Sequence, residues 1–198
     1  FLVIICVEMQ TCKSTSAPFS SLLVFLKDET SSRLLERILE VSDKKQLRRV
    51  FKNHFQAQLH TLSAHPIANY TVQRLIGATQ TKKLFSTVFD ELSPALEDIL
   101  AKGHMGIITG LAEACKRLKI RQSALLTQLM EAFHCAVPAS RQVTCVPLFL
   151  SLITYEIYYQ KEGEEEPSEH QGGVLCPVYF ILFINNLVLD MMVQSRDG

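Results

Sequence analysis

The sequence predicts an all-α protein in which short helical units stack into an α-solenoid. Apolar residues recur at steps of three and four from Lys27 to Arg121, without the strict alternation that marks strands. Glycine and proline are sparse, at 8 and 7 of 198 residues. The helical pattern also repeats along the chain, which is typical of units that form a core only by covering one another.

The clearest amphipathic stretch is 44–62, where we predict a helix. Asp43 precedes it as the expected N-cap, because its carboxylate can accept from the free N–H groups of the first turn. The apolar residues that fall on one face of this helix are Leu47, Val50, Phe51, Phe55, Leu59 and Leu62.

A shift of 37 residues superimposes a first unit on a second, and apolar positions coincide over two successive helices. The coinciding pairs include Leu35 and Val72, Leu47 and Leu84, Phe55 and Leu92, and Leu59 and Leu96. A weaker third copy follows at a shift of 39. Agreement over more than one helix indicates a repeat rather than two unrelated amphipathic helices.

In each of the first two repeats, the middle helix begins with a five-residue stretch that has polar residues at its first, second and fifth positions. These residues are Ser32, Arg33 and Glu36 in the first repeat and Asn69, Tyr70 and Gln73 in the second. Within each of these pentapeptides, 32–36 and 69–73, the first and fifth residues lie one turn apart on the same helical face, and the second residue projects beside them. In a stack, such faces line up along one concave surface.

These residue types suit the recognition of nucleic-acid bases. The amides of Asn69 and Gln73 both donate and accept, which matches the mixed edge of uracil. A carboxylate only accepts, so Glu36 with Ser32 suits the N–H donors of guanine. The flat second-position side chains can stack on neighbouring bases.

The segment 65–75, HPIANYTVQRL, resembles a repeat of the Pumilio family, whose one-base-per-repeat code includes Asn-Tyr-x-x-Gln for uracil. The pattern Ser32-Arg33-x-x-Glu36 is similar to the guanine form of that code. The resemblance runs from about Lys27 to Gln171, and segments such as 131–135 and 140–142 resemble the nucleolar branch of the family.

The resemblance implies that the protein binds single-stranded RNA. The expected location is the nucleolus, within the nucleus, and the expected target is precursor ribosomal RNA during maturation of the small subunit. Pre-ribosomal proteins are further candidate partners, and no cofactor or small-molecule substrate is implied. RNA runs antiparallel to the repeats in this family, so the two units imply a local 5′-UG-3′ preference. The third unit carries Ile108, Thr109 and Ala112 at the corresponding positions, and we expect no base-edge recognition there.

Simpler interpretations compete with a site. Polar residues that open an amphipathic helix are usually caps or a solvated face, and only their recurrence in register favours a site. Arg37 and Arg74 also recur in register, where they would contact phosphate or form a salt bridge within the stack. The basic run 44–52 is either a solvated helix face or part of an RNA-binding surface.

The formal net charge of zero excludes no class of partner, because it is a cancellation between segments. Eight basic and no acidic residues occur from Lys44 to Phe89, whereas acidic residues gather in 162–169. No nucleophile elbow, phosphate-binding loop or zinc motif occurs in the sequence, so we predict neither an enzyme nor a metal site. The six cysteines lack disulfide spacing and are expected to be reduced and mostly buried, as in an intracellular protein.

We expect an apolar N-terminal segment at 1–26, a repeat region at 27–160, an acidic linker at 161–173 and an apolar tail at 174–198. Polar residues interrupt the tail, which favours a buried helix, or a segment foreign to the family, over a membrane span. Two alternatives to RNA binding stay open. They are a HEAT-like or armadillo-like scaffold for a protein partner, and a small membrane-anchored helical protein.

Overall fold

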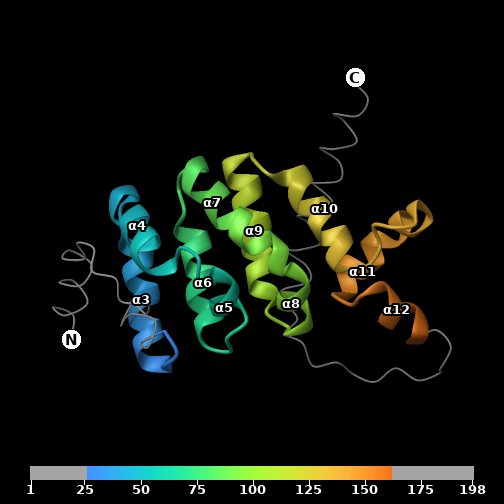
Figure 1. Cartoon of the computed structure of the whole chain (residues 1–198), viewed down its shortest axis with the longest axis horizontal. Helices are drawn as coiled ribbons and strands as arrows, with labels where there is room; N and C mark the ends of the chain where they lie inside the picture. Colours follow the sequence, from blue (N-terminus) through green and yellow to red (C-terminus); the bar gives the residue numbers. More distant parts are fainter. Residues whose placement is uncertain (1–25, 162–198) are drawn as a thin grey trace. The chain divides into compact units, whose positions relative to one another are not determined.

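The computed structural model describes residues 26–161, which are helical with no strand among them (Figure 1). This confirms the all-α prediction for that part of the chain. The expectations for the N-terminal segment, the acidic linker and the apolar tail fall on residues outside the described range. No helix within 26–161 combines the length and apolar character needed to cross a bilayer. The chain divides after Leu92 into two compact units, each described by itself.

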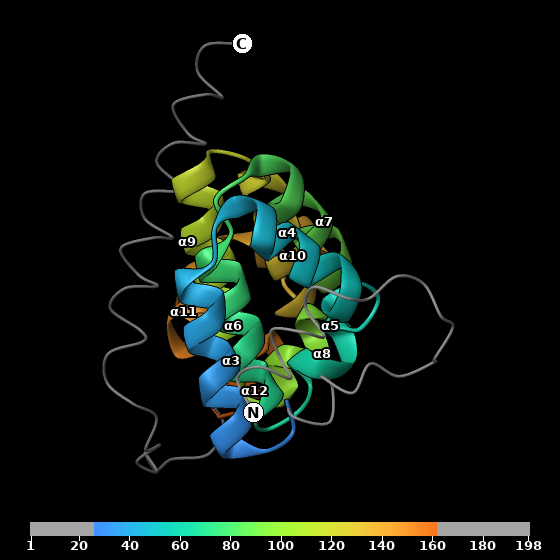
Figure 2. The ribbon, with the colours of Figure 1, turned by 90° about the vertical axis from the view of Figure 1, so that its left-hand side faces the viewer.

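The first unit contains α3 (Glu29–Val41), α4 (Lys44–Val50), a π-helical turn (Phe51–Phe55), α5 (Leu59–Ser63), α6 (Ala68–Ala78) and α7 (Lys82–Leu92). Helix α3 packs along α6, and α5 packs against both α6 and α7. Figure 2 shows α3 and α6 side by side, with α4 and α7 on another side of the unit. The two polar pentapeptides therefore lie on neighbouring helices.

Asp28 and Asp43 start the first two helices. The Ser31 N–H donates to the Asp28 carboxylate at 2.9 Å, and this bond, with a second from the Ser31 hydroxyl, lowers the pKa of Asp28. Asp43 accepts from the backbone N–H groups of Lys45 and Gln46, both at 2.8 Å, while the Gln46 side chain accepts from the Asp43 N–H at 3.2 Å. This capping box confirms Asp43 as the N-cap.

The prediction of one helix over 44–62 is wrong, although its buried face is confirmed. The stretch forms α4, the π-helical turn and α5, because Ala57 adopts a left-handed conformation with φ of 65° and turns the chain. The N-terminus of α5 is bound by a residue distant in the sequence, because the Leu59 N–H donates to the Glu91 carboxylate of α7 at 2.8 Å. The six apolar residues are nevertheless all buried: Leu47, Val50, Phe51, Phe55, Leu59 and Leu62.

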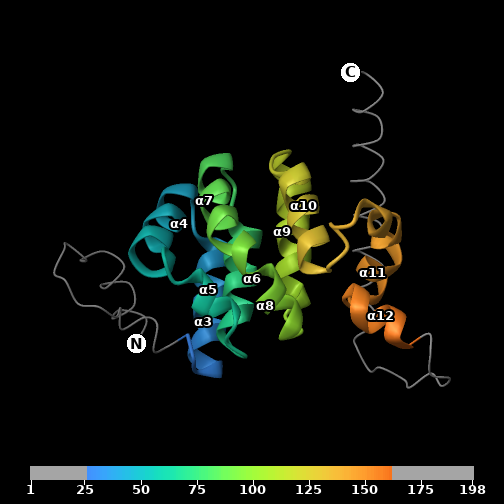
Figure 3. The same cartoon turned by 45° about the vertical axis from the view of Figure 1, so that its right-hand side comes forward.

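The second unit contains a 3-10 turn (Ser93–Ala95), α8 (Leu96–Ala101), α9 (Met105–Leu118), α10 (Gln122–Ala132), a 3-10 turn (Ala139–Thr144), α11 (Cys145–Ser151) and α12 (Tyr155–Lys161). Helix α10 packs against both α8 and α9, and Figure 3 shows α9 and α10 side by side. The rings of Phe133 and Phe149 meet edge to face at 5.0 Å between centroids, which joins the end of α10 to α11.

The thiols of this unit lie in apolar surroundings. Cys115 and Cys135 are buried, and burial raises their pKa values to about 12 and about 11. Cys145 is half-buried. The expectation of buried thiols is therefore confirmed for two of the three described cysteines.

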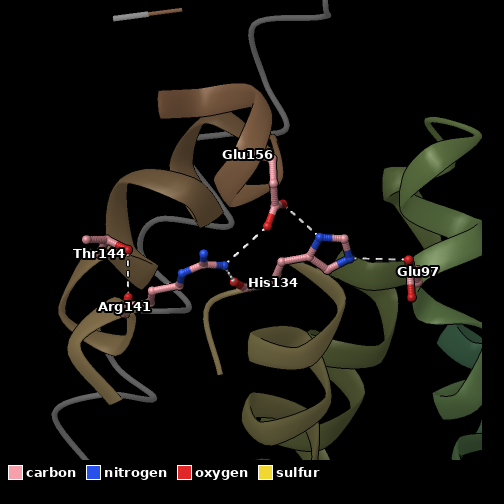
Figure 4. Close-up of polar contacts among 5 residues, drawn as sticks. All are labelled: Glu97, His134, Arg141, Thr144 and Glu156. Carbon is pink, nitrogen blue, oxygen red and sulfur yellow. Dashed lines mark hydrogen bonds and ion pairs between the residues drawn. The ribbon is translucent and has the colours of Figure 1, made fainter. Parts of the chain in front are cut away.

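A cluster of charged residues connects three elements of the second unit (Figure 4). His134 follows α10 with φ of 58°, and its ring lies between two carboxylates. Its Nδ1 is 2.8 Å from Glu156 of α12, and its Nε2 is 3.3 Å from Glu97 of α8. Arg141 contacts Glu156 at 3.2 Å and stacks over the Tyr155 ring at 4.1 Å.

The two carboxylates change how His134 titrates. The hydrogen bond with Glu156 raises the pKa of His134 above its ordinary 6.5, with a further contribution from Glu97, although partial burial opposes the change. Burial alone would raise the pKa of Glu156, but hydrogen bonds from its own backbone and from His134 lower it overall. The cluster therefore favours a charged His134.

Candidate nucleic-acid interface

A cleft of about 340 Å³ lies on the α3 and α6 surface of the first unit. Its lining consists of Glu29, Ser32, Arg33, Glu36, Ile67 and Tyr70. The structure thus brings together, around one cleft, four of the six residues that the sequence singled out. The size falls within the range of small-ligand sites, and it suits a single base rather than a helix or strand of a partner.

The first-position residues, Ser32 and Asn69, are buried at 2% exposure each. The Ser32 hydroxyl donates to the backbone oxygen of Glu29 at 3.0 Å. The Asn69 side-chain nitrogen donates to the backbone oxygens of His65 at 3.0 Å and Pro66 at 2.7 Å. Both side chains are therefore bound to the first turn of their own helices, and the half-buried fifth-position residues, Glu36 and Gln73, are the more accessible ones.

Asn69 orients Gln73. Because both N–H groups of the Asn69 amide are donated to backbone oxygens, its Oδ1 must face the other way. Gln73 Nε2 donates to that oxygen at 3.0 Å. The half-buried Gln73 is left with its Oε1 and its second N–H, neither of which has a partner among residues 26–161. One acceptor beside one donor matches the N–H and a carbonyl of uracil.

Glu36 is held from the neighbouring repeat. Arg74 of α6 lies 3.5 Å from Glu36 Oε2 and 3.4 Å from Glu40, both on α3. Arg37 also contacts Glu40, at 2.6 Å. Of the two interpretations of Arg37 and Arg74, the structure therefore shows the salt bridge. The Glu36 side chain is 15% exposed, and its second oxygen has no partner among the described residues.

Arg33 and Tyr70 supply the flat surfaces of the cleft from its two different helices. The Tyr70 side chain is an exposed aromatic, with 57% of the residue accessible. Arg33 is exposed as well, and Glu29 holds its guanidinium at 2.6 Å from one turn earlier. A base whose edge meets Glu36 could stack on these planar groups.

The third sequence repeat has different residues at the three corresponding positions. Ile108 and Ala112 are buried in the core, and the Thr109 hydroxyl donates to the backbone oxygens of Met105 and Gly106. These positions serve packing and local helix structure.

Sequence reasoning missed Glu29, Ile67 and the positioning role of Arg74. Glu29 could have been found, because it stands four residues before Arg33 on the same helix. Ile67, just before α6, lines the cleft beside the α3 residues, and Arg74 of α6 contacts Glu36 of α3. The spacing of residues within one helix does not reveal such contacts between helices.

Helices of successive repeats that place hydroxyl, carboxylate and flat side chains around one cleft define a repeat protein of the Pumilio type. The chain belongs to the family described as NOP9-like PUF repeat domain, whose model matches residues 3–175.

Curated relatives agree with this assignment. The chain is 51% identical to Nucleolar protein 9 of Mus musculus over 167 residues, which cover 83% of this chain and 26% of the relative. It is 52% identical to Nucleolar protein 9 of Homo sapiens over 161 residues, covering 80% and 25%. Pumilio homolog 23 of Arabidopsis thaliana is 29% identical over 134 residues, covering 68% and 18%. The chain thus spans about a quarter of the length of the first two relatives.

Solved structures share the fold. The structure described as APUM23-GGAAUUGACGG matches with a TM-score of 0.69 and 24% identity, over 92% of this chain and 34% of that one. A second, described as APUM23-GGAUUUGACGG, matches with a TM-score of 0.68 over the same shares. At this identity the likeness establishes the all-α Pumilio-type repeat fold.

Proposed function

We propose that this chain binds single-stranded RNA on precursors of ribosomal RNA, in the nucleolus, during small-subunit biogenesis. The observation that carries the proposal is the cleft lined by Ser32, Arg33, Glu36 and Tyr70. Relatives named Nucleolar protein 9 support the location, and solved structures that pair APUM23 with uracil-containing oligonucleotides support the ligand class. Pumilio-type repeat proteins are generally non-enzymatic, and we propose no catalytic step here.

Guanine fits the cleft by hydrogen bonding and stacking. The unpartnered oxygen of Glu36 accepts from the N–H donors on the Watson–Crick edge of guanine, which uracil and cytosine present differently. Arg74 holds the carboxylate in place through its other oxygen, at 3.5 Å. Arg33 and Tyr70 provide flat groups on which the base stacks. Hydrogen bonds to Glu36 therefore position the edge of the base, and stacking positions its face.

Uracil fits the next position along the repeats. Gln73 offers an acceptor and a donor side by side, and Asn69 holds that amide in the orientation that presents them. Since the family's RNA runs antiparallel to its repeats, the two sites together select 5′-UG-3′.

The test is a comparison of short RNAs that contain UG with RNAs in which only the U is replaced by A. Gln73→Ala should weaken binding of the UG RNA on the order of tenfold, because a lost pair of hydrogen bonds costs roughly 1–3 kcal/mol. Binding of the U-free RNA should be unchanged. Gln80→Ala is the matched control, since Gln80 is an exposed glutamine just after α6 that takes no part in the Asn69–Gln73 pair.

The scaffold alternative predicts a different outcome. A protein-binding solenoid would show no base preference and no measurable affinity for short RNA. Equal losses on both RNAs for Gln73→Ala would also contradict recognition of uracil by the second repeat.

A further inference from the structure

A second concave site lies in the first unit, away from the cleft. We call it the α4–α7 groove; its volume is about 520 Å³. One wall is α4 with the π-helical turn, and the other is the N-terminal half of α7 with the residue before it. The lining residues are Lys44, Lys45, Arg48, Phe51, Lys52, Gln56, Thr81, Lys83, Leu84 and Thr87. None of them lines the base-binding cleft.

The groove concentrates positive charge. Lys44, Arg48 and Lys52 follow one another at steps of four, so they lie along one side of the helical wall at roughly 6 Å intervals. Lys83 faces them from the α7 wall, and Lys45 completes the set. A regular row of cations along a groove suits a polymer with regularly spaced negative charges.

These cations have no acidic partners. No ion pair of Lys44, Lys45, Arg48, Lys52 or Lys83 exists among residues 26–161, and no Asp or Glu occurs from Lys44 to Phe89. Asp43 directly precedes Lys44 in the chain, but its carboxylate oxygen accepts from two backbone N–H groups at the start of α4. By contrast, all three arginines of α3 and α6 contact a glutamate.

The remaining lining favours a phosphate backbone over an acidic protein segment. Phe51 and Leu84 are only 3% and 7% exposed, and no exposed large hydrophobic residue of the described chain lines the groove. Protein partners need apolar or aromatic anchors at the centre of an interface, and the groove offers none. Thr81, Thr87 and Gln56 add the neutral polar groups that commonly accompany Lys and Arg at phosphates.

We propose that the α4–α7 groove binds the sugar–phosphate backbone of RNA without base preference, as a second contact separate from the cleft. The groove lacks exposed aromatic rings for stacking, so it contributes affinity but no sequence selection. This proposal does not depend on base recognition by Glu36 or Gln73.

The experiment measures binding of the whole chain to a twelve-residue oligo(C) RNA, which contains neither U nor G, at several salt concentrations. Arg48→Gln with Lys83→Gln removes one cation from each wall. The affinity should fall on the order of tenfold at 0.1 M salt, and the salt dependence of log K should become shallower by about 1.4, at roughly 0.7 per phosphate contact.

The matched control is Arg49→Gln with Lys82→Gln. These residues are the immediate neighbours on the same helices and carry the same charge, but they do not line the groove. Affinity should change less than twofold. Equal losses for both double variants would show a general charge effect and overturn the groove as a site, as would no loss for either.

A poly-Glu peptide of similar charge separates the competing partner class. If its binding depends on Arg48 and Lys83 while oligo(C) binding does not, the groove binds acidic protein and the proposal is wrong. Gln73→Ala should leave oligo(C) binding unchanged, so failure of the groove and failure of base recognition give different results. Thermal unfolding of every variant checks that these exposed substitutions leave the fold intact.

Discussion

The side-chain oxygen of Asn69 accepts a hydrogen bond from the side-chain nitrogen of Gln73 at 3.0 Å, one turn further along α6. The same Asn69 donates twice to the backbone at the start of that helix. The pair therefore works as one unit, in which the buried residue determines which atoms the accessible residue presents.

We predict that the losses caused by Asn69→Ala and Gln73→Ala in binding a uracil-containing RNA are strongly non-additive. Asn69 acts by holding the Gln73 amide, so the double variant should bind about as weakly as Gln73→Ala alone. The measurement is a double-mutant cycle on UG RNA, with the U-free RNA as reference. Additive losses would mean that Asn69 contacts the base independently.

We predict that Glu36→Gln reduces the preference for guanine on the order of tenfold, since an amide replaces one acceptor with a donor. Competition between RNAs that differ only at the G measures this preference. Glu40→Gln is the control, because Glu40 also contacts Arg74 at 3.4 Å but does not line the cleft. A similar change in both variants would assign the effect to Arg74 rather than to base contact.

We predict that Thr71→Val leaves the chain as stable or raises the free energy of unfolding by about 1 kcal/mol, because the variant removes a buried polar group without a partner. Thr71 is fully buried, and its hydroxyl has no hydrogen-bond partner among the described residues. Chemical denaturation measures the change.

Thr79→Val provides the contrast. Thr79 is equally buried, but its hydroxyl donates to the backbone oxygen of Leu75 at 2.8 Å, so its removal should destabilise by about 1 kcal/mol. Equal effects of the two substitutions would contradict the assignment of a bond to one hydroxyl and none to the other.

We predict opposite effects of alanine at two glycines that both have open space around them. Gly77 lies within α6, and an added Cβ there meets nothing within 4 Å, so Gly77→Ala should stabilise by about 0.5–1 kcal/mol. Gly103 has equal space but a φ of 71°, which disfavours a side chain. Gly103→Ala should therefore destabilise, and thermal unfolding distinguishes the two effects.

We predict that the stabilising effect of His134 is greatest at mildly acidic pH. Its pKa is raised above 6.5 in the folded chain, so its contribution is fully present below that value and is lost as the pH rises through the folded pKa. Glu156 has a lowered pKa, so its contribution is present above 4.5 and is lost in acid.

The measurement is the difference in free energy of unfolding between the chain and His134→Asn. Asparagine tolerates the left-handed conformation at this position, which isolates the ring and its charge. The difference should be larger at about pH 6 than at about pH 9. A difference independent of pH would contradict a charged pairing with Glu97 and Glu156.

The repeat and its buried face could be predicted because they are local properties. The period of 37 residues reappears in the starts of α5 and α8, at Leu59 and Leu96. The Asp43 cap is local as well, since its partners lie within three residues. The break after the π-helical turn could not be predicted from local spacing. The first N–H of α5, that of Leu59, donates to the carboxylate of Glu91, which lies 32 residues further along the chain.

By itself, the sequence determined the helical units, their register and the residue types that recur on the middle helix, because periodicity and spacing act within a few turns. Only the tertiary structure decided which of those polar side chains are accessible and which are buried. Ser32 and Asn69 are buried against their own helix starts, whereas Glu36 is held by Arg74 from the neighbouring repeat. Accessibility and side-chain partners depend on groups brought together from distant positions, so a linear pattern specifies the candidates and packing selects among them.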